Sequence, residues 1–185
     1  MPPEGASEKN ARVFALLERV LFLKEIDIFL NVETERLSVV ADIAREVHVA
    51  AGDTLAREGD PGESLYIIKS GSLRIVKEKD GKLYPLKNLG PGESYGVFGV
   101  LGDQHRTSGA VANEASVLLE IRKSEFKKML LSNPEIAYNI LEILSKRINE
   151  MDNEIVLLNQ ALSSTLHARP GENEKRTPPT LKETV

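Results

Sequence analysis

The sequence predicts an α+β fold in which helices precede and follow an antiparallel roll or barrel of short β-strands. Eleven of the 13 glycines fall between Gly52 and Gly109, and β-branched and aromatic residues stand between them, as in short strands joined by turns. Before and after this region, apolar residues recur at intervals of three and four, as on one face of a helix. No helical pattern long enough to connect parallel strands interrupts the glycine-rich region, which favours antiparallel pairing.

The N-terminal part divides into a polar segment and two helices. Residues 1–9 are polar and contain proline and glycine, so we expect a disordered tail there. Residues 10–45 are expected to form the N-terminal helices, with a break at Asp27–Phe29. The second helix covers about 35–44, and Thr34 is its expected N-cap because a threonine hydroxyl can accept a hydrogen bond from the first turn.

Residues 46–122 are expected to form the roll. Asp80-Gly81 is the clearest turn signal, because glycine tolerates the positive φ that a type I′ hairpin requires. A second turn is expected at Asn113-Glu114. The strands expected around these turns and before them are 65–68, 72–79, 82–89, 107–112 and 117–121.

Residues 123–165 are expected to form a short helix followed by a long one. Asn133-Pro134-Glu135 is typical of a helix start, with asparagine as the cap and proline in the first turn. Beyond it, apolar residues alternate steps of four and three over more than three heptads, which indicates a coiled-coil seam. The seam consists of Ala137, Leu141, Leu144, Ile148, Met151, Ile155, Leu158 and Leu162. We expect this dimerisation helix to pair with a second copy from Ile148 onward; the alternative is that it packs on its own roll. Residues 166–185 are expected to be a disordered tail.

The composition excludes several classes of function. The 185 residues carry a net charge of −4, so no overall positive field attracts nucleic acid or an anionic membrane. The absence of cysteine excludes disulfides and thiolate chemistry. His48, His105 and His167 are far apart in the sequence, which argues against a metal site and a metal-dependent enzyme. Neither a secretory signal nor a membrane-spanning stretch is recognisable, so we expect a cytoplasmic protein without membrane insertion.

A resemblance to a known family rests on two segments, AGDTLAREGDPGESLYIIKSGSLRI (51–75) and GPGESYGVFGVLGDQHRTSGAVA (90–112). They are similar to the cyclic-nucleotide-binding domain of the bacterial catabolite activator protein and of kinase regulatory subunits, and the likeness extends over residues 23–153. The resemblance implies an eight-stranded, jelly-roll-like β-roll with N-terminal helices and a long C-terminal helix. It also implies a regulatory sensor that is not an enzyme.

The second segment contains the positions at which this family binds the phosphate of its ligand. The resemblance implies that Arg106 supplies the countercharge and that Thr107 offers a hydroxyl. It also implies a short helix whose free backbone N–H groups face the phosphate. The expected ligand is cyclic AMP or cyclic GMP, with no other cofactor. Within this segment, which we call the cassette, the expected contacts are Tyr95, Gly96, Val97, Phe98, Arg106 and Thr107.

Two positions depart from the family's pattern. Val97 stands where the family has a glutamate that accepts a hydrogen bond from the ribose 2′-hydroxyl. The absence of this hydrogen bond costs roughly 1–3 kcal/mol of binding free energy, about ten- to hundredfold in affinity. Met151-Asp152 stands where the catabolite activator presents two hydroxyl residues to the purine, and Asp152 can accept from an exocyclic amine. These departures leave open a degenerate domain that binds no nucleotide and acts as a dimeric protein-interaction module.

We expect the domain to pass its signal to another protein. The residues after the heptads are rich in charge and proline and fit no helix-turn-helix, so we expect no sequence-specific DNA binding. A ligand-gated module without its own output domain acts through an effector chain. The sequence does not identify that effector. The partner that it does predict is a second copy of the chain, in a homodimer.

Overall fold

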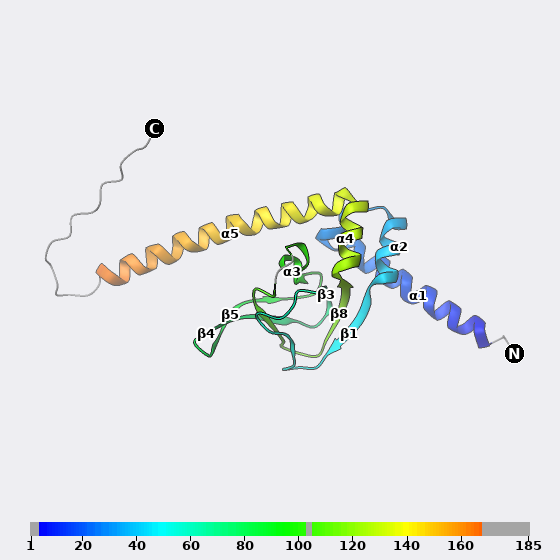
Figure 1. Cartoon of the computed structure of the whole chain (residues 1–185), viewed down its shortest axis with the longest axis horizontal. Coiled ribbons are helices and arrows are strands. Elements are labelled where there is room, and N and C mark those ends of the chain that lie inside the picture. Colours follow the sequence, from blue (N-terminus) through cyan, green and yellow to red (C-terminus); the bar gives the residue numbers. More distant parts are fainter. Residues whose placement is uncertain (1–3, 103–104, 168–185) are drawn as a thin grey trace, which may run out of the picture. The chain divides into compact units, whose positions relative to one another are not determined.

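The structure, a computed structural model, describes residues 4–102 and 105–167. It divides into two compact units, Met1–Ile143 and Leu144–Val185. The first contains the N-terminal helices, all of the strands and the start of the last helix (Figure 1). The second contains the rest of that helix, and the expected tail beyond His167 lies outside the described residues.

The N-terminal helices are α1 (Glu4–Lys24), the 3-10 turn η1 (Asp27–Phe29) and α2 (Thr34–Ile43). Helix α1 begins before residue 10, where the expected tail ended, because glutamate, alanine and lysine in that segment favour helix. Thr34 is the first helical residue and Glu33 takes the N-cap position, so the expected threonine cap is wrong. The guanidinium of Arg19 donates to the carbonyls of Ala41 and Ala44, which fastens α1 across the end of α2.

Eight antiparallel strands form two four-stranded sheets, as the resemblance implied. The first sheet has the order β1 (Arg45–Val49), β8 (Ser116–Arg122), β3 (Ser64–Ser70) and β6 (Ser94–Tyr95). The second has the order β2 (Thr54–Ala56), β7 (Gly109–Ala112), β4 (Leu73–Lys79) and β5 (Lys82–Leu89). The core cluster takes apolar residues from both sheets, including Ile68 and Leu118 from the first and Leu73 and Ala110 from the second.

The expected hairpin at Asp80-Gly81 is confirmed. Strands β4 and β5 pair across it, and both turn residues have positive φ, 53° and 70°, as a type I′ turn requires. The turn after β7 has a different role, because β7 pairs with β2 and β4 whereas β8 pairs with β1 and β3. That turn therefore carries the chain from one sheet to the other.

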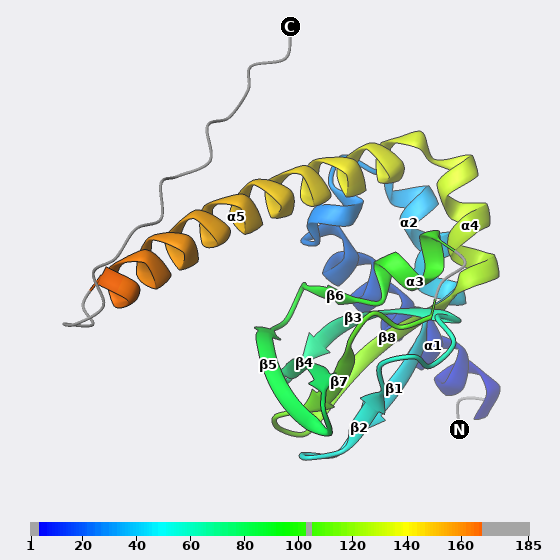
Figure 2. The same ribbon diagram turned by 60° about the vertical axis from the view of Figure 1, so that its left-hand side comes forward.

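Two helices follow the strands, α4 (Lys123–Ser132) and α5 (Pro134–His167). Helix α4 packs against β3, β8 and the short helix α3 (Val97–Leu101), and it lies with α2 at one end of the roll (Figure 2). The side chain of Asn133 donates to the carbonyl of Met129 at 2.8 Å and accepts from Arg36 at 3.2 Å. The expected cap of α5 thus closes the end of α4 and ties it to α2.

The first turns of α5 are held by a face that differs from the expected seam. Ile136, Asn139 and Ile140 are buried, whereas Leu141 is 65% exposed. The Asn139 amide donates to the carbonyls of Ile28 and Leu30 at 3.1 and 2.8 Å. Of the seam residues at the start of α5, Ala137 and Leu144 are partly buried, so the neighbouring face with Ile136 and Ile140 makes the larger contact. None of the helices in the described ranges has the length and apolar character to cross a membrane.

Candidate functional site

The short helix of the cassette, α3, begins where β6 ends in a tight turn. Gly96 follows β6 with φ 98° and ψ 7°, a left-handed conformation that glycine adopts without strain, and α3 starts at the next residue. A side chain at this position would overlap the guanidinium of Arg106, and its Cβ would lie 2.8 Å from the carbonyl oxygen of Ser64. Glycine is therefore required here both by the backbone and by the space beside Arg106.

The backbone of Arg106 is held in place by the loop between β2 and β3. Its amide donates to the carbonyl of Asp60 at 2.7 Å, and its carbonyl accepts from the amide of Gly59 at 2.9 Å. The preceding residue, His105, forms an isolated antiparallel bridge with Pro61. These bonds fix the point from which the arginine side chain enters the domain.

The Arg106 side chain is buried and only partly satisfied. It is 5% exposed, and its Nη2 donates to the carbonyl oxygen of Ser64 at 2.7 Å. Within residues 4–102 and 105–167, its Nε and Nη1 have no hydrogen-bond partner and no ion pair includes it. A buried donor without a partner costs about 1–3 kcal/mol, and more when it is charged. The arrangement therefore suits an anion that supplies the missing acceptors.

Two tyrosines lie against the guanidinium. The Cζ atom of Arg106 is 5.0 Å from the centroid of the Tyr95 ring and 5.5 Å from that of Tyr66. The two rings are 6.5 Å apart at an interplanar angle of 23°. Burial raises the pKa of Tyr95 to about 12 and also raises that of Tyr66, while Arg106 acts in the opposite direction on both. Both phenols are therefore neutral at ordinary pH and do not neutralise the arginine.

The hydroxyl groups of the two tyrosines are bound away from the arginine. Tyr95 donates to the carbonyl of Ser108 at 2.6 Å. Tyr66 and Ser64 both donate to the same carboxylate oxygen of Glu120, at 3.3 and 2.7 Å. Sequence reasoning missed Tyr66 and Ser64, since their link to the cassette depends on the pairing of β3 with the two-residue strand β6.

The structure brings together only part of the expected site. Tyr95, Gly96 and Arg106 meet, and Val97 follows as the first, partly buried residue of α3. Phe98 is 50% exposed. Thr107 is also exposed, with its carbonyl accepting from Lys77 at 2.8 Å. Asp152 is an exposed residue of the second unit, so its role at the cassette stays a prediction.

The second unit leaves the rest of the seam uncovered. Leu144 is partly buried, but the seam residues after it are between 52% and 63% exposed. These are Ile148, Met151, Ile155, Leu158 and Leu162. Such a continuous apolar row on a single helix is typical of a surface that another chain covers.

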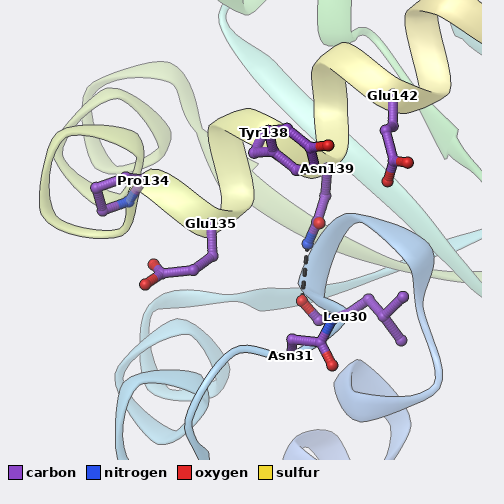
Figure 3. Close-up of a pocket in the computed structure, with 7 residues that line it drawn as sticks. All are labelled: Leu30, Asn31, Pro134, Glu135, Tyr138, Asn139 and Glu142. Carbon is purple, nitrogen blue, oxygen red and sulfur yellow. Dashed lines mark hydrogen bonds between the residues drawn. The ribbon is translucent and has the colours of Figure 1, made fainter.

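A separate cavity of about 370 Å³ lies between the segment after η1 and the first turns of α5 (Figure 3). Its lining residues are Leu30, Asn31, Pro134, Glu135, Tyr138, Asn139 and Glu142. The Asn139 amide in this cavity is engaged by backbone carbonyls and serves to attach α5. Among the residues that the structure describes, no group of three or more histidine, aspartate and glutamate side chains is suited to holding a metal ion. The cassette, with its unpaired arginine donors, is therefore the better candidate site.

Comparison with known proteins identifies the domain that contains the cassette. Residues 46–133 match the family model described as the cyclic nucleotide-binding domain. The chain is 32% identical over 108 residues to the cyclic AMP receptor protein of Thermus thermophilus. The aligned region covers 58% of this chain and 50% of that protein. It is 27% identical over 112 residues to the cGMP-dependent protein kinase of Caenorhabditis elegans, covering 59% of this chain and 14% of the kinase. The chain thus spans half or less of the length of these relatives.

Solved structures give the same assignment. The Thermus thermophilus catabolite activator protein superposes with a TM-score of 0.66 at 28% identity, over 72% of this chain and 63% of that one. The regulatory domain of Toxoplasma gondii PKA, crystallised with cAMP, superposes with a TM-score of 0.58 at 29% identity, over 62% of this chain and 44% of that one. Residues 46–133 of this chain are therefore a cyclic nucleotide-binding domain, with homologues among catabolite activator proteins and kinase regulatory subunits.

Proposed function

We propose that this chain is a regulatory module, not an enzyme, that binds a cyclic nucleotide through Arg106 and signals to an effector protein through α5. The observation that carries the proposal is the buried guanidinium of Arg106, whose Nε and Nη1 have no hydrogen-bond partner among the described residues. The family supports the ligand class, because relatives of this domain include a cyclic AMP receptor and cGMP-dependent kinases.

The charge balance of the cassette favours a phosphate. A cyclic phosphate carries one negative charge and two exocyclic oxygen acceptors, which match a single guanidinium that has donors to spare. No acidic side chain lies between Ser94 and Gly102, so the start of α3 contains no carboxylate that could pair with Arg106 in the ligand's place. The ligand would therefore satisfy the buried donors without displacing a carboxylate of this segment.

The proposal is tested by isothermal titration of the protein with cyclic AMP and cyclic GMP after any co-purified nucleotide has been removed. We expect saturable binding of at least one of the two nucleotides at micromolar concentration or below. Heat of dilution alone up to millimolar nucleotide would overturn the proposal. It would leave the alternative function, a domain that has lost its ligand.

Changing Val97 to Glu is expected to strengthen the binding of cyclic AMP by about ten- to hundredfold. A carboxylate at this position restores an acceptor for the ribose 2′-hydroxyl, worth about 1–3 kcal/mol. Titration calorimetry measures the change, and 2′-deoxy cyclic AMP should show none of the gain. Leu83→Glu, which adds the same charge on the exposed strand β5, is the matched control. Equal affinity in Val97→Glu and the wild type would show that position 97 does not face the ribose.

A second candidate function, a dimeric interaction module that needs no ligand, is favoured by the exposed apolar row on α5. The double change Ile155→Glu and Leu158→Glu is expected to weaken self-association by at least about hundredfold, because it forces charges into the seam. Sedimentation equilibrium measures the dissociation constant. Gln160→Glu, which adds charge to the exposed helix off the seam, should leave it unchanged. A dimer that survives the double change does not use this seam.

A further inference from the structure

The cation at Arg106 is stabilised by aromatic rings where a buried arginine is usually paired with a carboxylate. Its Cζ lies 5.0 and 5.5 Å from the ring centroids of Tyr95 and Tyr66, within the range of a cation–π interaction. A buried charge is normally paired or hydrogen-bonded, because its desolvation is costly. Here the two rings take the place of the counter-ion.

The fold presents the two rings as one surface. Tyr66 on β3 and Tyr95 on β6 are directly opposite each other in the antiparallel register. Their hydroxyl groups are anchored on Glu120 and on the carbonyl of Ser108, so neither hydroxyl is a hydrogen-bond partner of the guanidinium. We call this pair of rings the aromatic platform. It supports Arg106 through the ring faces and leaves the Nε and Nη1 donors uncommitted.

A carboxylate partner would have a different effect on the site. It would take up the N–H donors and cancel the positive charge, so an incoming anion would have to displace it. The ring quadrupole attracts the cation without adding a net charge. An arginine held on the platform therefore keeps both its full charge and its free donors while it is shielded from water.

We propose that Tyr66 and Tyr95 are positioning residues that hold Arg106 as an uncompensated cation, ready for the ligand's anionic group. The ring face of each tyrosine performs this role, and its hydroxyl only anchors the ring. The inference rests on the proposed function for the identity of the ligand, but the platform itself is a property of the ligand-free protein.

Ring removal and hydroxyl removal separate the two roles. Tyr66→Leu and Tyr95→Leu are each expected to weaken cyclic AMP binding by about three- to thirtyfold in titration calorimetry, the range of a buried cation–π contact. Tyr66→Phe and Tyr95→Phe keep the ring and should stay within about threefold of the wild type. Tyr84→Leu, a matched change on the exposed strand β5, should leave the affinity unchanged. Tyr66 is only half-buried, so its leucine variant remains informative where Tyr95→Leu fails to fold.

An NMR measurement on the ligand-free protein tests the platform without any nucleotide. The ring currents of two tyrosines should move the side-chain N–H resonances of Arg106 upfield of those of exposed arginines. The leucine variants should reduce this displacement, and the phenylalanine variants should retain it. A wild-type protein that shows the ring-current displacement but binds no nucleotide would overturn the proposed function alone. Arginine resonances at their ordinary positions, or equal affinity in the leucine and phenylalanine variants, would overturn the platform.

Discussion

Replacing Arg106 by leucine is expected to abolish cyclic AMP binding, with an affinity loss of at least about hundredfold, and to stabilise the ligand-free protein. Binding is lost because the cassette then offers neither the charge nor the free donors. The free energy of unfolding is expected to rise by about 1–3 kcal/mol, because two buried unpaired donors are removed from an apolar environment. A stability gain that accompanies a loss of binding is the pattern expected of a residue retained for its ligand.

Titration calorimetry and urea unfolding measure the two effects on the same samples. Arg74→Leu removes an arginine from the exposed face of β4 and should change neither the affinity nor the stability appreciably. Arg106→Lys keeps the positive charge but loses the guanidinium geometry, so we expect partial binding. An Arg106→Leu protein that binds cyclic AMP as tightly as the wild type would remove Arg106 from the site.

Changing Gly96 to alanine is expected to reduce both folding stability, by about 2–4 kcal/mol, and ligand affinity, by at least about tenfold. The new Cβ adds strain at φ 98° and overlaps the guanidinium of Arg106, with the carbonyl of Ser64 behind it. Gly52→Ala is the matched control, because Gly52 has φ 84° but nothing within 4 Å of an added Cβ. Thermal or urea unfolding of the two variants separates backbone strain from the clash.

A double-mutant cycle identifies the group with which alanine at position 96 collides. In the Arg106→Leu background the guanidinium is gone, so Gly96→Ala should cost less than it does in the wild type. Equal costs in the two backgrounds would mean that the guanidinium is not the group with which the new Cβ collides, which leaves the carbonyl of Ser64. A cost in the wild type no larger than that of Gly52→Ala would mean that Gly96 is required only by its backbone conformation.

Local patterns predicted the parts of the structure that local forces determine. The hairpin at Asp80-Gly81 formed as expected, because a type I′ turn depends on two adjacent residues. The meeting of Tyr95, Gly96 and Arg106 was anticipated from the family resemblance, which supplied the long-range pairing that spacing alone does not contain. At Gly96, between β6 and α3, the local preference for glycine in a tight turn and the family resemblance lead to the same prediction.

The features that the sequence did not predict depend on tertiary contacts. Tyr66 reaches the site only because β3 pairs with β6, and a two-residue strand leaves no periodic pattern to detect. In the sequence, nothing distinguishes Asn139 from other polar residues of a helix. In the fold, its side-chain amide donates to the carbonyls of Ile28 and Leu30. Helix α5 carries apolar residues on two adjacent faces, and periodicity does not say that the Ile136 face is the one that is buried.

The central claim is that the free donors of Arg106 receive the ligand's anionic group, and a crystal structure of the protein with cyclic AMP tests it most directly. We predict a phosphate oxygen within hydrogen-bond distance of Nε or Nη1, with the guanidinium still lying over the rings of Tyr66 and Tyr95. A nucleotide bound with its phosphate away from Arg106, while Nε and Nη1 remain without a partner, would contradict the account.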